Sequence, residues 1–77
     1  MKITYAWEES DIIPGICFII RVKNTFYKYI IITTEFGNTE CFNCVYINKG
    51  TLVFPSGVTK QLLAERLTDL QAEPSTL

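Results

Sequence analysis

The chain has 77 residues and a mass of 8.8 kDa, the size of one small domain. Hydrophobic residues make up 48% of it and charged residues 19%, which excludes an intrinsically disordered chain. A formal net charge of −1 lacks the cationic excess of most DNA- and RNA-binding proteins, and eight carboxylates are too few for a protein that mimics DNA.

Targeting signals are not evident in the sequence. The chain starts Met1-Lys2-Ile3-Thr4-Tyr5 without a long apolar stretch, and no apolar run reaches the roughly 18–20 residues of a membrane span. Three cysteines are an odd count, which does not suit the disulfide framework of a secreted protein. We therefore expect a cytoplasmic protein with reduced thiols and no membrane association.

The first half of the chain predicts three strands. Residues 2–7 form a short candidate, and a polar connection follows that ends in the turn signal Pro14-Gly15. Residues 16–23 and 26–35 are rich in isoleucine and aromatic residues, so they predict two longer strands joined by a turn at Asn24-Thr25.

The second half predicts two more strands and a helix. Gly37-Asn38 is a two-residue hairpin signal, and residues 40–48 and 51–54 predict the strands that follow it. A helix is expected over residues 58–71, with Ser56 or Thr59 as its N-cap. We expect one α+β domain over residues 1–72, an antiparallel meander of four to five strands followed by a C-terminal helix packed on one sheet face, and a flexible tail over residues 73–77.

Those turns imply a register, with Arg21 opposite Lys28, Ile19 opposite Ile30, and Ile30 opposite Val45. Because side chains alternate along a strand, this register separates two faces. One face, which we call the helix face, has no charge and is expected to form the core; it holds Ile16, Phe18, Ile20, Val22, Tyr27, Tyr29, Ile31, Phe42, Cys44, Tyr46 and Val53.

The opposite side, the second face, is also apolar in its middle, although one helix can cover only one face. An exposed apolar patch of this extent usually marks an interface. The alternative is a closed small barrel in which the N-terminal segment shields this face. We favour a protein partner, with a homodimer as the first hypothesis; the candidate interface residues are Cys17, Ile19, Ile30, Ile32, Val45, Ile47, Leu52 and Phe54.

Basic and aromatic residues gather at one hairpin end. Opposed like charges destabilise a strand pair, so Arg21, Lys23 and Lys28 favour a nearby anion: a carboxylate of this chain, an acidic partner or phosphate. With Phe26 they also support a rival hypothesis, a small β-barrel that binds single-stranded nucleic acid. The simplest interpretation is a solubilising hairpin end that prevents edge aggregation.

Two further residues are candidates for contact with a partner. Arg66 falls inside the apolar arc of the predicted helix, where its stem lies on the apolar surface or its guanidinium pairs with a carboxylate of the chain or of a partner. Trp7 and Phe26 are aromatic anchor candidates, because tryptophan often dominates interface energy, but for a single tryptophan in a small protein core packing is the favoured interpretation.

Catalytic chemistry finds little support. Cys41 and Cys44 form a CxxC pattern, but residues three apart on a strand point to opposite faces, and the chain has no histidine. Glu35 and Glu40 flank the Gly37-Asn38 turn, where solvated charges are expected. We therefore expect no cofactor, no metal, no small-molecule substrate and no enzymatic activity.

The sequence thus indicates a non-catalytic protein-binding module, a small dimeric inhibitor or adaptor that blocks or bridges another protein. Viral and mobile-element genomes encode single-domain proteins of this size that block a host enzyme or defence complex, and size and missing catalytic groups suggest the same here. Apart from a second copy, the sequence does not identify the partner, and nucleic acid is the less favoured one.

Overall fold

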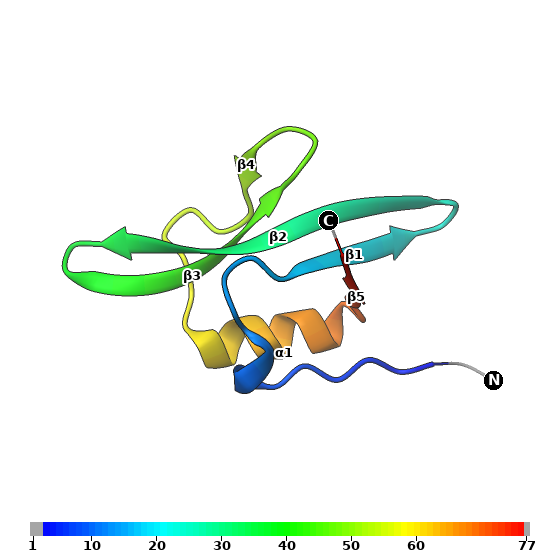
Figure 1. Cartoon of the computed structure of the whole chain (residues 1–77), viewed down its shortest axis with the longest axis horizontal. Helices are drawn as coiled ribbons and strands as arrows, with labels where there is room; N and C mark the ends of the chain where they lie inside the picture. The colour runs from blue at the N-terminus through cyan, green and yellow to red at the C-terminus, as the bar shows by residue number, and fades with distance from the viewer. Residues whose placement is uncertain (1–2, 77) are drawn as a thin grey trace.

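The computed structural model describes residues 3–76, which form an elongated molecule of 45 × 26 × 19 Å. Its centre is one antiparallel sheet with the strand order β4-β3-β2-β1-β5. The helix α1 (Lys60–Asp69) and the short 3₁₀ helix η1 (Glu9–Asp11) lie on the same side of this sheet (Figure 1). The predicted fold class is confirmed; the strands are β1 (Cys17–Val22), β2 (Thr25–Phe36), β3 (Thr39–Tyr46), β4 (Thr51–Leu52) and β5 (Glu73–Ser75).

The hairpin of β2 and β3 has the predicted turn and register. Gly37 opens the two-residue turn with a φ of 66°, a value that favours glycine. Ile30 lies opposite Val45, and Glu35 lies opposite Glu40, as expected. This hairpin is the longest in the sheet and extends beyond the end of β1 (Figure 1).

The register predicted between β1 and β2 is wrong by two residues. The turn is formed by Lys23 and Asn24, with Lys23 at a φ of 57°, so Arg21 lies opposite Phe26 and Ile19 lies opposite Lys28. The expected opposition of Arg21 to Lys28 is therefore absent. Because the shift is an even number of residues, the side chains of β1 and β2 keep their predicted faces.

The core forms between the helix face and α1, as predicted, but four residues of that face that were expected in the core are exposed: Ile16, Val22, Tyr27 and Val53. Phe18 and Ile31 of the sheet are almost fully buried in one cluster with Leu63 of α1 and Ile12, which lies in the loop between η1 and β1. Thr59 is the N-cap of α1, because its hydroxyl accepts a hydrogen bond of 3.1 Å from the backbone N–H of Leu62. The helix is two residues shorter than predicted at each end.

Trp7 belongs to this core, which corrects its candidacy as an exposed anchor. Only 9% of its surface is exposed. Its indole Nε1 donates a hydrogen bond of 2.8 Å to the carbonyl of Ala72, and its ring meets Phe18 edge to face with 5.9 Å between centroids.

Both ends of the chain differ from the prediction. Residues 3–7 do not join the sheet; they run beside the C-terminal end of α1, where the Gln71 side chain bonds both the N–H and the carbonyl of Tyr5. Glu73–Ser75, expected in a flexible tail, pairs with β1 as β5. Pro74 interrupts the strand pattern in the sequence, but prolines are tolerated on edge strands, which is where β5 lies.

After β4 the chain bulges outward along the edge of β3 and returns at a bridge between Phe42 and Val58. The Asn43 side chain holds this bulge: its amide donates to the Phe54 carbonyl at 2.6 Å and its oxygen accepts from the Phe54 N–H at 3.1 Å. Gly57 passes so close to the sheet that a Cβ would lie 2.6 Å from the Cβ of Cys41. The bulge redirects Phe54, which packs against the core instead of lying on the second face, where it was predicted.

Candidate protein-binding surfaces

The second face carries aliphatic side chains across four strands. Cys17, Ile30, Val45 and Leu52 lie side by side on β1 to β4. A hydrogen bond of 3.1 Å from the N–H of Ile47 to the carbonyl of Lys28 places Ile47 next to this row. No helix lies on this side of the sheet in Figure 1.

Exposure is uneven across the predicted interface. Cys17 and Ile19 are buried between β2 and the edge strand β5, so they are poor contact residues. Phe54 has left this face for the core, and the other five residues form what we call the aliphatic strip: Ile30, Ile32, Val45, Ile47 and Leu52. In it, Ile47 is 37% exposed and Leu52 49% exposed. The half-buried members of the strip are Ile30, Ile32 and Val45.

Polar groups beside the aliphatic strip are satisfied within the chain. The Arg21 guanidinium pairs with the Glu73 carboxylate at 2.9 Å and stacks 5.9 Å from the centre of the Phe26 ring. The Lys28 ammonium donates a hydrogen bond to the Thr76 carbonyl. A carboxylate of the same chain is thus the anion that the basic hairpin required.

The basic hairpin is therefore a weaker candidate for phosphate contact than its composition suggests. Arg21 and Lys28 are engaged within the chain, and Lys23 occupies the turn itself. Phe26 remains 58% exposed at the hairpin end, beneath the Arg21 guanidinium.

The two CxxC cysteines lie on opposite faces, as predicted. Cys44 packs in the core on the helix face, and burial raises the pKa of its thiol to about 12, so the thiol is protonated near neutral pH. Cys41 lies on the other side, under Gly57. Within residues 3–76, no group of three or more His, Cys, Asp or Glu side chains is arranged to hold a metal ion.

A cleft opens on the helix side of the sheet, and we call it the Arg66 groove. It has a volume of about 270 Å³ between α1, the strands β1 to β3 and the two residues that follow β4, Val53 and Phe54. Buried Phe18, Leu63 and Leu67 form its floor. Exposed Val53 and Leu70 flank it, and Arg66 is its only charged residue. Within the described part of the chain, Arg66 makes no ion pair.

Tyrosine rings extend the sheet wall of the Arg66 groove. Tyr29 stacks on Phe18 with 5.3 Å between centroids, and Tyr46 lies 5.5 Å from Tyr29 and 5.7 Å from Tyr27. Burial, followed by the neighbouring Tyr46 and Tyr27, raises the pKa of Tyr29 above its ordinary 10.0. The Tyr29 hydroxyl is thus a neutral hydrogen-bond donor at physiological pH.

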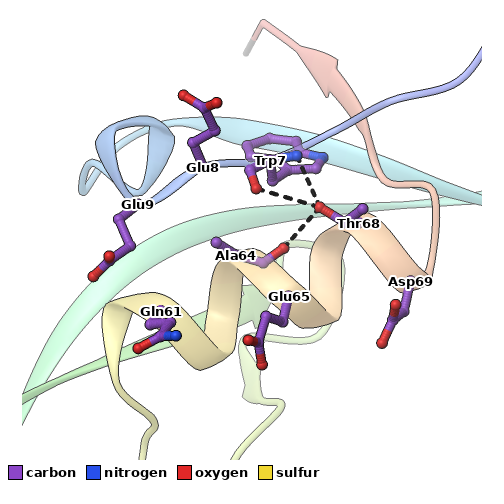
Figure 2. A pocket seen from close by; sticks show the side chains of 8 residues that line it. All are labelled: Trp7, Glu8, Glu9, Gln61, Ala64, Glu65, Thr68 and Asp69. Carbon is purple, nitrogen blue, oxygen red and sulfur yellow. Dashed lines mark hydrogen bonds between the residues drawn. The ribbon is translucent and has the colours of Figure 1, made fainter.

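The opposite side of α1 carries an acidic groove of about 280 Å³ (Figure 2). Its framework is Thr68, whose hydroxyl oxygen accepts a hydrogen bond of 2.8 Å from the N–H of Trp7 and donates one of 3.0 Å to the carbonyl of Ala64. Four carboxylates surround this framework, and Figure 2 shows them along the two sides: Glu8, Glu9, Glu65 and Asp69.

Sequence reasoning found Arg66 but missed both grooves. Helical periodicity places Arg66 in the apolar arc, and a cation there signals an apolar surface that ends near solvent. The acidic groove had a partial signal, since Glu65 and Asp69 are four residues apart and share one side of α1. Glu8 and Glu9 lie beside them only because the N-terminal segment packs against α1, and no local sequence pattern predicts that packing.

The described residues hold no helix with the length and hydropathy needed to cross a bilayer. The chain matches no family model, and the searches of curated proteins and of solved structures find no significant similarity.

Proposed function

We propose that this protein is a non-catalytic protein-binding module that acts as a homodimer joined through the second face. The observation that carries the proposal is the aliphatic strip, which lies on the sheet side opposite α1 (Figure 1). Aliphatic surface of this kind gains free energy when it is removed from water, at about 25 cal/mol per Å². In the dimer, the two sheets pack face to face about 10 Å apart.

A second copy suits this face because the aliphatic strip carries no charge and the cations beside it already have contacts within the chain. Arg21 already has Glu73, Lys28 already has the Thr76 carbonyl, and Asn43 already bonds the Phe54 backbone. Burying an unpaired charge costs several kcal/mol, so the uncharged strip can pack against an identical strip while Arg21, whose side chain is 62% exposed, and Lys28 stay in water at the rim. An acidic or basic partner would find no free counter-charge in the strip.

The dimer presents two copies of α1 and its grooves on its outer surfaces. This arrangement suits an inhibitor or adaptor that occupies a surface on another protein. The basic hairpin gives less support to nucleic-acid binding, because two of its three cations are engaged within the chain.

The test compares two arginine substitutions at positions of equal exposure. Leu52→Arg places a charge in the strip, and Val22→Arg does so on the helix-face side of the sheet; both native side chains are 49% exposed. We expect Leu52→Arg to halve the mass measured by light scattering and Val22→Arg to leave it unchanged. A Leu52→Arg protein that remains a dimer would overturn the proposed interface.

A further inference from the structure

We propose that the Arg66 groove binds a segment of a partner protein in which a bulky apolar side chain lies next to an aspartate or glutamate. The inference rests on the protein-binding part of the proposed function and not on the dimer. It concerns the side of the sheet opposite the aliphatic strip.

The shape of the groove fits an apolar anchor. The floor consists of core residues that do not move without disturbing the fold, such as Phe18 and Leu63, which are 1% and 0% exposed. The flanks are open, with Val53 at 44% and Leu70 at 54% exposure. A volume of about 270 Å³ accommodates one or two large side chains of an incoming segment.

Charge complementarity identifies the second element of the partner. Arg66 is the only charged residue in the lining, and among residues 3–76 it has no carboxylate partner. A guanidinium beside apolar walls binds a carboxylate in a bidentate manner, and partial exclusion of water strengthens the pair. Tyr29 also lines the groove, and its neutral hydroxyl is a further hydrogen-bond donor for an anionic group.

The residue types favour a protein over a small amphiphile. Tyrosine and arginine are enriched at the centres of protein interfaces, where rigid aromatic rings supply contact area at low entropic cost. Here Tyr27, Tyr29 and Tyr46 form a continuous row beside the groove. Such a row extends the contact beyond the cleft and suits a peptide segment several residues long.

The experiment begins with a phage-displayed library of random dodecapeptides, selected on the purified protein. We expect the enriched peptides to share an Asp or Glu within about four residues of a Phe, Leu or Trp. The selected peptide is then titrated by fluorescence polarisation against the wild type, Arg66→Gln and Lys60→Gln. Lys60 is the matched control, because it is an exposed cation of the same helix that does not line the groove.

Arg66→Gln should weaken binding about tenfold or more, and Lys60→Gln should leave it unchanged. Replacing the peptide's Asp or Glu by Asn or Gln should weaken binding to the wild type by the same factor. The amide peptide should then bind Arg66→Gln as well as it binds the wild type, because the pair is already lost. Thermal unfolding verifies that both variants are folded. Repeating the titration on Leu52→Arg separates the proposals, because groove binding should persist when the dimer is broken.

Three outcomes would overturn the inference: no enriched peptide, enriched peptides without an acid, or equal affinity for Arg66→Gln. A fourth concerns a second copy of the chain as the occupant. If Leu70→Glu breaks the dimer while Leu52→Arg does not, the groove is the dimer contact and the proposed partner is wrong.

Discussion

The two faces of the sheet are built from alternate residues of the same strands, yet they meet different surroundings. Ile31 points to the helix face and is completely buried, whereas its neighbours Ile30 and Ile32 point to the second face and stay half-buried. The difference is not one of hydrophobicity, since all three are isoleucines. It arises because α1 and the N-terminal segment both lie on one side (Figure 1).

In a chain of 77 residues, one apolar sheet face can thus be buried in the core while the other stays partly exposed. The core beneath α1 supplies the packing that folds the domain. The second face contributes to the sheet as pleated, β-branched surface, and in the proposed dimer it gains its remaining burial against the second copy. Its stabilising contribution should therefore depend on protein concentration, and that of the helix face should not.

The largest expected effect comes from comparing Ile31 with Ile30. Ile31→Ala should lower the free energy of unfolding by about 2–5 kcal/mol, because it leaves a cavity in a fully packed site. Ile30→Ala should lower the free energy of unfolding by a smaller amount in dilute solution, and by a larger amount as the protein concentration rises. Chemical denaturation at several concentrations measures both, and equal, concentration-independent losses would contradict the contrast between the faces.

Part of the second face is covered by the bulge that Asn43 holds, and this region should be nearly as sensitive as the core. Asn43 is 1% exposed, and Asn43→Ala would leave the Phe54 N–H and carbonyl without their partner. We expect a loss of about 1–3 kcal/mol in the free energy of unfolding. Asn48→Ala is the control, because Asn48 is exposed and bonds only the Tyr46 hydroxyl; equal losses would sink the role given to Asn43.

Alkaline pH should weaken the helix face in particular. The pKa of Cys44 rises from 9.0 to about 12 in the fold, so the unfolded chain releases this proton first and stability falls as pH rises from 9 toward 12. The pKa of Tyr29 is also raised, so its titration should further lower the free energy of unfolding above pH 10. For Cys44 the slope is at most about 1.4 kcal/mol per pH unit.

Cys44→Ala isolates that effect. The variant should be less stable at neutral pH, because it leaves a small cavity, but should lose less stability than the wild type between pH 9 and pH 11. Urea denaturation at each pH provides the measurement. A wild-type slope that survives in Cys44→Ala would assign the alkaline sensitivity to other groups.

The smallest effect is expected from the ion pair beside the aliphatic strip. Arg21 and Glu73 form an exposed pair at 2.9 Å, so Glu73→Gln should cost less than about 1 kcal/mol, and the loss should shrink as salt screens the charges. Glu65→Gln is the control, since this carboxylate makes no ion pair within residues 3–76. A loss above 2 kcal/mol that persists at high salt would show that the pair is more than a surface contact.

Alternation along the strands was sufficient to predict the fold class and the two faces. The same reasoning misplaced the turn between β1 and β2. Asn24 is a residue type that often adopts a positive φ, but in the fold it is Lys23 that does so. The faces survived the error because the shift was even. Phe54 was assigned to the wrong face because alternation ends at the bulge that Asn43 holds, and this contact joins residues eleven positions apart.

Some of the candidate surfaces could be predicted from the sequence and others could not. The aliphatic strip follows from counting one helix against two apolar faces, and Arg66 follows from its position in a helical arc. The partners of Arg21 and Lys28 were not predictable, because they lie in β5 and just after it, and Pro74 made this segment resemble a tail. Neither groove has a local signature, since each forms only where segments distant in sequence meet.

The homodimer is tested by the absolute mass of the wild-type protein in solution, measured by light scattering on a sizing column across a dilution series. A homodimer should have a mass of twice 8.8 kDa at high concentration and dissociate on dilution. A protein that stays at 8.8 kDa at every concentration would contradict the homodimer and leave the aliphatic strip exposed in the free chain.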